Sequence, residues 1–389
     1  MRPAVLLVLT CLLRLYPSQA QPVNGLNFEH IYDPLAEVVM QLNPVIYRDS
    51  VSVHYRLKTS NAAPTRYLIK WEKRESFGQR QGTAIGSADT LLLTKSWTTG
   101  QLPFVPPEKP WLLMVRVTNI ATGKYFYFMR QVEAHYPVNG YLERAGVEEW
   151  DTFVSAENTY TVRGSRPSNP VRVSYYRDNF PTPSPPFVVK EIRMDRFLFP
   201  DSTFTVSSGA STGPFRHQGV YLAQEDTASE RGFAFYVKKS PYPKYNTLEE
   251  LKGPLLFVTT REENDALTKA GEDKTMFDRV ILDITKDKER ARNFMRSYFR
   301  RVETANFYFT SFKEGWKTDR GMIYIVFGRP DEVYMDGGYE EWRYKSPRQS
   351  FRFARAGSVY NPDHSVLVRE KGYTEAWYMT IDLWRKSRF

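Results

Sequence analysis

The chain has 389 residues, of which 41% are hydrophobic and 15% aromatic. This is enough to build roughly two to four buried cores and excludes a disordered chain. A single cysteine, Cys11, excludes intramolecular disulfides. The formal net charge is +10, but acidic residues interleave with basic ones almost everywhere. The pattern favours a solvated mixed-charge surface over a nucleic-acid-binding one.

The N-terminus has the features of an export signal. Arg2 precedes a mainly apolar run, residues 4–13, that is too short to span a bilayer. Residues 18–20, Ser-Gln-Ala, place small side chains where a signal peptidase cleaves. Residues 1–20 are therefore predicted to be a signal peptide. The mature chain is expected in the periplasm, associated with the outer membrane, or at the cell surface, without a transmembrane span. Acylation of Cys11, which follows Val-Leu-Thr, is the alternative.

The first two thirds of the chain are predicted to be mostly β. Short runs with period-two alternation, such as residues 51–57, recur between turn-rich stretches. Residues 111–119 and 125–132 flank a Gly-containing turn and predict a hairpin. We interpret residues 21–136 as one immunoglobulin-like β-sandwich domain and residues 137–240 as a second.

The residue pattern predicts helices after Pro243. Asn246 is predicted to cap a short helix through Leu251, and Thr260 with Glu263 forms a second capping pattern. These helices make residues 241–280 a helical connector.

An α+β domain is predicted for residues 281–389. Its clearest helix runs from about 286 to 302 with Thr285 as N-cap and apolar residues at spacings of three and four. The apolar run 322–327 and residues 341–344, 351–354 and 376–383 are predicted strands, the last of them an edge strand. The fold class is thus multi-domain and mostly β, with an α+β domain at the C-terminus.

The most distinctive residues lie in this last domain. They are Gly315-Trp316-Lys317-Thr318-Asp319-Arg320-Gly321, then Gly-Arg-Pro-Asp-Glu at 328–332, and Glu-Trp-Arg-Tyr at 341–344. With the amphipathic helix before them, these runs resemble the GWxTD-domain family, exported proteins of Bacteroidetes and related bacteria. The resemblance covers roughly residues 280–389. It brings no catalytic residue with it.

Two interpretations compete for the motif. In the structural one, the glycines make tight turns, Thr318 and Asp319 accept backbone hydrogen bonds, and Arg320 pairs with Asp319, Glu340 or Glu341. In the functional one, the same loops surround a binding cleft. The candidate interaction or structural residues are Gly315, Trp316, Thr318, Asp319, Arg320, Gly321, Gly328, Arg329, Pro330, Asp331, Glu341 and Trp342.

No cofactor or metal is expected. The five histidines are far apart in sequence and show no ligand spacing. Gly209-Ala210-Ser211-Thr212-Gly213 matches a serine-hydrolase pattern, but Pro214 and a strand-like run follow it, where a nucleophile elbow requires a helix.

The expected function is that of a non-enzymatic cell-envelope protein that acts as an interaction or assembly module. Its C-terminal domain would recognise another envelope or outer-membrane protein through Trp316, Arg320, Arg329 and Trp342. The alternative is a polysaccharide-binding or polysaccharide-degrading protein with Asp319, Asp331 and Glu341 as acids. A hydrolase requires two carboxylates about 5 to 10 Å apart on an open cleft, whereas a recognition domain would bury them beside arginines.

Overall fold

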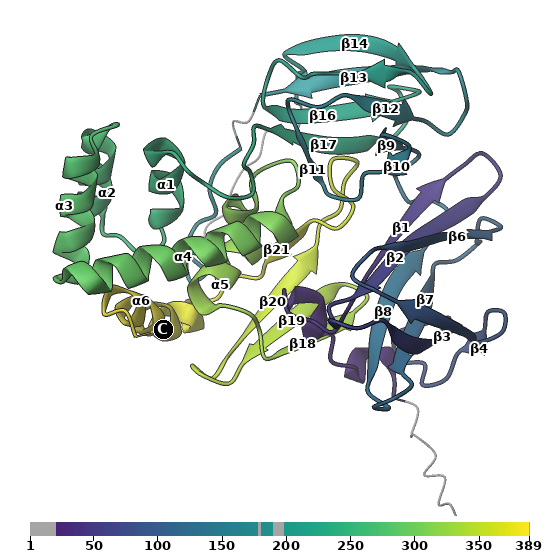
Figure 1. Cartoon of the computed structure of the whole chain (residues 1–389), viewed down its shortest axis with the longest axis horizontal. Coiled ribbons are helices and arrows are strands. Elements are labelled where there is room, and N and C mark those ends of the chain that lie inside the picture. Colours follow the sequence, from purple (N-terminus) through teal and green to yellow (C-terminus); the bar gives the residue numbers. More distant parts are fainter. Residues whose placement is uncertain (1–20, 178–179, 190–197, 389) are drawn as a thin grey trace, which may run out of the picture.

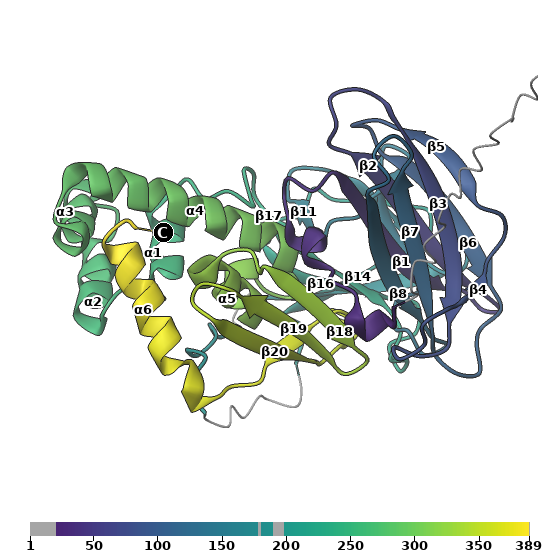
Figure 2. The same ribbon diagram turned by 90° about the horizontal axis from the view of Figure 1, so that it is seen from below.

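The computed structural model describes residues 21–177, 180–189 and 198–388. The chain is mostly β, with several antiparallel sheets and a helical C-terminal region (Figure 1). The helices gather at one end of the molecule and the first β region lies at the other, with the C-terminal sheet between them (Figures 1 and 2). The predicted signal peptide, Cys11 included, falls outside the described residues. None of the described helices is long and apolar enough to cross a membrane.

The first β region consists of two antiparallel sheets around one core. One sheet has the order β1-β2-β6, and the other has β4-β3-β7-β8 with β5 paired to β3. The strands are β1 (Val38–Ile46), β2 (Val51–Thr59), β3 (Thr65–Arg74), β4 (Thr83–Ala84), β5 (Asp89–Leu93), β6 (Thr98–Phe104), β7 (Trp111–Asn119) and β8 (Tyr125–Val132). Alternation along β3 buries Tyr67, Ile69 and Trp71. The predicted hairpin is confirmed, with Thr118 opposite Tyr125.

The second β region also has two sheets around one core. Their strand orders are β10-β9-β12-β15 and β11-β17-β16-β13-β14, and β11 pairs with β17 in parallel. The strands are β9 (Tyr141–Arg144), β10 (Val147–Glu148), β11 (Phe153–Ser155), β12 (Tyr160–Arg163), β13 (Pro170–Tyr176), β14 (Ser202–Ser207), β15 (Ser211–Thr212), β16 (Gly219–Gln224) and β17 (Phe233–Lys238). Ser211 begins β15 without a following helix, so the segment is not a nucleophile elbow.

Four helices follow, and their caps correct the predicted boundaries. They are α1 (Leu248–Leu255), α2 (Arg261–Ala270), α3 (Lys274–Thr285) and α4 (Lys288–Phe309). The Thr260–Glu263 capping box at α2 is confirmed. At α1 the N-cap is Thr247, not Asn246, because Glu250 completes a capping box with Thr247.

The helix α3 was not predicted from the sequence, and the predicted start of α4 was therefore wrong. Thr285 is the last residue of α3, whereas Asp287 caps α4 by accepting a hydrogen bond from the Arg290 backbone. The α4 helix continues beyond Val302 to Phe309.

The C-terminal sheet is antiparallel, in the order β18-β19-β20-β21. Its strands are β18 (Glu332–Asp336), β19 (Tyr339–Tyr344), β20 (Gln349–Arg355) and β21 (Ser365–Leu367). Two predicted strands are wrong. Residues 322–327 belong to helix α5 (Asp319–Phe327), and residues 376–383, predicted as an edge strand, belong to helix α6 (Thr374–Arg385). Both runs are apolar around most of the helix, so their hydrophobicity alone does not distinguish helix from strand.

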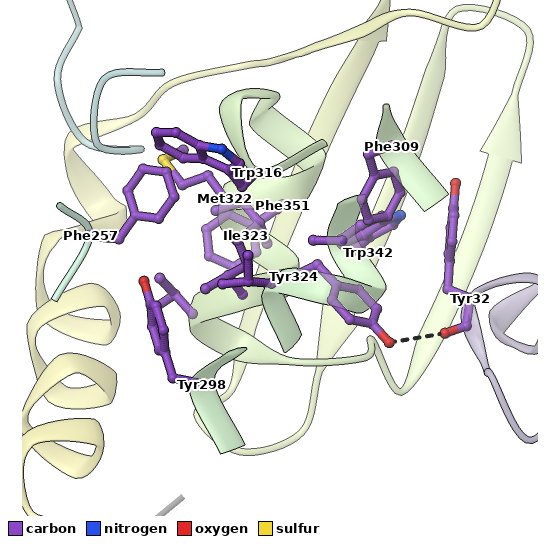
Figure 3. Close-up of a cluster of buried hydrophobic side chains, with 14 of the residues drawn as sticks. Tyr32, Phe257, Tyr298, Phe309, Trp316, Met322, Ile323, Tyr324, Trp342 and Phe351 are labelled. Atoms are coloured by element: carbon purple, nitrogen blue, oxygen red, sulfur yellow. Dashed lines mark hydrogen bonds between the residues drawn. The ribbon is translucent and has the colours of Figure 1, made fainter. Parts of the chain in front are cut away.

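The core on the C-terminal sheet includes residues from the start of the chain. Two short 3-10 helices, η1 (Val23–Gly25) and η2 (Glu29–Tyr32), precede β1. The Phe28 backbone N–H donates to the Val333 carbonyl at 2.8 Å. The Tyr32 ring lies 5.0 Å from the Trp342 ring, and Tyr324 donates to the Tyr32 carbonyl (Figure 3). The N-terminal segment is therefore packed into the C-terminal core.

Candidate functional site

The residues of the motif form a sharp corner between α4 and α5. A Cβ added at Gly315 would lie 2.2 Å from the Ala305 carbonyl oxygen, and one added at Gly321 would lie 1.9 Å from the Gly315 carbonyl oxygen. Side chains do not tolerate such distances, so both positions require glycine for close backbone approach. The glycines allow the 3-10 turn η3 (Gly315–Lys317) to lie directly on α4.

Thr318 closes this corner as the N-cap of α5. Its hydroxyl accepts a hydrogen bond from the Gly321 backbone at 3.0 Å and donates to the Gly315 carbonyl at 2.7 Å. The cap satisfies one of the free amides at the start of a helix. The prediction that Thr318 accepts a backbone hydrogen bond is confirmed.

Asn306 holds the corner from the side of α4. It is fully buried, accepts from the Trp316 backbone at 3.0 Å and donates to the Pro243 carbonyl at 3.2 Å. Asn306 was not among the predicted site residues. A signal was present, because Asn306 follows Val302 by four positions on the apolar stripe of α4, where a polar side chain needs partners.

Trp316 points inward from the corner. It is 5% exposed and meets Phe257 edge to face at 6.0 Å (Figure 3). A Cβ added at Gly253 in α1 would lie 2.8 Å from the Trp316 ring, which shows how closely the indole packs on that helix. Trp316 therefore packs against the helical layer.

Glu314 lies beneath this indole at the centre of a buried polar cluster. It accepts from Lys238 at 2.8 Å, Tyr245 at 2.7 Å and the Trp316 indole at 3.2 Å, and Lys317 lies 3.1 Å away. Burial opposes ionisation of Glu314, but the charges of Lys238 and Lys317 outweigh it and lower its pKa. Glu314 was not among the predicted site residues, although it directly precedes the motif.

Asp319 connects α5 to the last strand of the sheet. It accepts from the Leu367 backbone at 2.9 Å and pairs with Arg369 at 2.6 Å. Arg369 also donates to the Ser184 carbonyl at 3.1 Å. The side chain of Asp319 is only 10% exposed, so this carboxylate lies in a buried, arginine-paired corner.

Arg320 joins the motif to the N-terminal half of the chain. It pairs with Glu340 at 3.2 Å, which is one of its three predicted partners. It also contacts the Tyr32 hydroxyl at 3.2 Å and donates to the Asp363 carbonyl at 2.7 Å. The Asp363 carboxylate accepts from Arg130 of β8 at 2.8 Å. These bonds lock the first β region against the C-terminal sheet.

The remaining candidates are spread along the sheet. Gly328 ends α5 with a φ of +87°, and Arg329 pairs with Asp33. Pro330 lies in the short segment between α5 and β18. Trp342, fully buried on β19, donates to Glu340 at 2.6 Å.

Asp331 and Glu341 each interact with residues outside the corner. Asp331 accepts from the Lys345 backbone at 2.7 Å, and Glu341 pairs with Arg343 along β19 at 2.8 Å. Together with Asp319, the three proposed acids occupy three separate environments. None of them lines the hollows found at Trp316, at Arg320 or between the two β regions.

The hollow beside Trp316 lies between α1 and α2. Its lining residues are Tyr245, Glu249, Glu250, Lys252, Gly253, Asn264, Thr268, Glu314, Trp316 and Lys317. Among the described residues, no group of three or more histidine, cysteine, aspartate or glutamate side chains is arranged to hold a metal ion.

Three solved structures show a remote likeness to this chain. A β-glucosidase from Kluyveromyces marxianus is 10% identical over 25% of this chain and 14% of its own, with a TM-score of 0.17. A putative β-galactosidase from Bacteroides fragilis is 14% identical over 31% and 19%, with a TM-score of 0.18. A chain of a chaperone–tip adhesin complex of CFA/I fimbriae is 9% identical over 52% and 99%, with a TM-score of 0.20. This chain thus spans less than a fifth of either glycosidase, and these likenesses carry no argument.

The comparison with protein families is informative. No curated protein matches the chain, but residues 219–386 match the model of the GWxTD domain. The match begins at β16 and so extends well beyond the segment that carries the resemblance in sequence. It contains the corner formed by α4, η3 and α5 and the sheet on which they pack, and this part of the chain is a GWxTD domain.

Proposed function

We propose that the protein is a non-enzymatic cell-envelope protein that acts as an interaction or assembly module. In this proposal it is exported to the periplasm or the outer membrane. Its two β regions are immunoglobulin-like sandwich domains that serve as a spacer, and the C-terminal domain recognises another envelope protein. Two sheets around a shared core in each β region support the sandwich assignment.

The main support for the recognition function is the exposed apolar face of α6. The inner face of this helix buries Trp377 and Trp384, yet Tyr378, Met379 and Leu383 are 57%, 55% and 40% exposed on the other side. Helices that cover a domain normally present polar residues to solvent. Neighbouring aromatic, methionine and leucine side chains on an exposed helix are typical of a protein-binding surface.

The environments of the carboxylates argue against polysaccharide hydrolysis. Asp319 is buried beside Arg369, and Glu341 pairs with Arg343 on the sheet. A glycoside hydrolase instead needs two carboxylates facing each other across an open cleft. We therefore place the recognition surface on α6 and not on the buried tryptophans of the motif.

In-cell crosslinking followed by affinity purification tests this proposal. The variant Tyr378→Ser/Leu383→Ser removes apolar surface from α6, and Val105→Ser is the matched control because Val105 is 84% exposed in the first β region. We expect the wild type and the control to be recovered with a stoichiometric envelope protein and the α6 variant without it, at unchanged thermal stability. A partner-free wild type would overturn the interaction function, and retention by the α6 variant would overturn the surface.

A further inference from the structure

The second β region ends in an edge strand that lacks the usual protection against pairing. Among the described strands, β14 is the last of its sheet and pairs with β13 alone (Figure 1). Its sequence, Ser-Thr-Phe-Thr-Val-Ser, contains no charged residue and no proline. Among the described strands that end a sheet and have four or more residues, β1, β5, β6, β8 and β18 each contain a proline or a charged residue. Natural edges are normally blocked by such residues.

The backbone of β14 presents free hydrogen-bonding groups outward. Ser208 N–H donates to the Asn169 carbonyl at 2.7 Å, in line with the register that places Val171 opposite Val206. Bonded pairs recur at every second residue in an antiparallel ladder. The even-numbered residues of β14 therefore face β13, and Thr203, Thr205 and Ser207 direct their amides away from it. Pro170, which has no N–H, lies opposite Ser207 in agreement with this assignment.

One face of β14 also leaves the core of the second β region open. Phe204 lies opposite Val173, and Val206 lies opposite Val171. Both valines of β13 are buried in that core, yet Phe204 is 37% exposed. An added strand on this edge would cover Phe204 and extend the core.

We propose that β14 pairs with β14 of a second copy of this chain, antiparallel about a two-fold axis at Thr205. A two-fold axis perpendicular to the sheet pairs residues of the same parity, so the outward amides of one copy meet those of the other. An axis at Thr205 brings all three outward-facing residues, Thr203, Thr205 and Ser207, into the ladder, whereas an axis at Phe204 or Val206 brings in only two of them. Each Thr205 then exchanges backbone hydrogen bonds with its counterpart, and the Ser207 amide reaches the Thr203 carbonyl of the other copy.

The side chains of this register match each other. Phe204 of one copy faces Val206 of the other, Thr203 faces Ser207, and Thr205 faces Thr205. Aromatic–β-branched pairs and hydroxyl pairs are favourable across strands. Because each residue of β14 meets a chemically suitable partner in its own copy, the strand is complementary to itself, which favours a second copy over an unrelated extended segment.

Thr205→Pro tests the pairing with little disturbance of the monomer. The Thr205 amide points away from β13, so proline removes no hydrogen bond within the sheet but removes both Thr205 amides from the interface. Thr205→Val keeps the amide and the β-branched shape and is the matched control. By sedimentation equilibrium we expect the full chain and the valine variant to form dimers, and the proline variant to dimerise at least about tenfold more weakly.

Disulfide trapping tests the register independently. With Cys11→Ser the full chain has no cysteine, so Thr205→Cys introduces one thiol on the proposed axis, where facing Cα atoms lie about 5.5 Å apart. Thr203→Cys is the control, because its two copies would be offset by four residues, about 13 Å. We expect rapid crosslinking at 205 and none at 203. A monomeric wild type, a dimer unaffected by Thr205→Pro, equal crosslinking at both positions, or trapping of a different protein would each overturn the proposal.

Discussion

The GWxTD corner and the β14 edge use their polar backbone groups in opposite ways. In the corner, Thr318 and Asn306 bond to the backbone around the glycines, and a buried carboxylate, Glu314, accepts from Tyr245 and the Trp316 indole. At the β14 edge, backbone groups of an uncharged strand point away from their own sheet. The most distinctive residues of the sequence therefore stabilise the interior, whereas the surfaces that we propose for partners consist of exposed apolar and edge residues without a motif.

The largest effect is expected from Trp316→Ala. Removing a buried indole should lower the free energy of unfolding by about 3–5 kcal/mol. Tyr378→Ala, which removes an aromatic ring that is 57% exposed, should cost less than about 1 kcal/mol. Urea denaturation of both variants measures the difference. If Trp316→Ala left stability unchanged and abolished partner binding, the corner would be a recognition surface. The contrast between a stabilising corner and an exposed β14 edge would then not hold.

Gly321→Ala should be next in size. Its Cβ would lie 1.9 Å from the Gly315 carbonyl oxygen, and relieving that clash requires the backbone of the corner to move, at about 3 kcal/mol. Gly372→Ala is the control, because a Cβ there meets nothing within 4 Å. Thermal melts of the pair should show a strongly lowered midpoint for Gly321→Ala alone.

Glu314→Gln should change how stability depends on pH. The pKa of Glu314 in the folded protein lies below its ordinary value of 4.5, so its ionised form stabilises the fold fully above about pH 4.5. That stabilisation is lost as the pH falls through the folded pKa. We expect a loss of about 2 kcal/mol at pH 7 that shrinks toward zero in acid. Denaturation at pH 7, 5 and 3.5 measures this trend, and a loss independent of pH would contradict it.

The smallest effect is expected from Thr318→Ala. Loss of the N-cap hydroxyl of α5 should cost about 1 kcal/mol. Thr318→Ser keeps the hydroxyl and should retain most of the stability. Equal losses in the two variants would mean that the methyl group of Thr318, and not its cap, matters in the corner.

Elements with strong local signals were predicted from the sequence. Alternation and a Gly-containing turn identified the hairpin that pairs Thr118 with Tyr125. The side chains of Thr260 and Glu263 identified the start of α2. These signals lie within a few residues of the structure that they determine, so no distant contact is needed to read them.

Apolar runs were predicted less well. Residues 322–327 form a helix buried on nearly every side, and α6 has apolar residues on both its buried and its exposed faces. Neither run shows the one-sided period that identifies an amphipathic helix. Local signals for α5 were nevertheless present, because Thr318 can cap its start and Gly328 ends it with a positive φ.

The amino-acid sequence was sufficient to predict the β-rich character of the chain, the capping box of α2 and the presence of a GWxTD domain. Which charged side chains meet became clear only in the folded chain. Arg320 had three candidate partners and pairs with Glu340, and Asp319 pairs with Arg369, fifty positions away. Partner choice among charges depends on distance and burial, which chain folding sets through contacts between residues far apart in sequence.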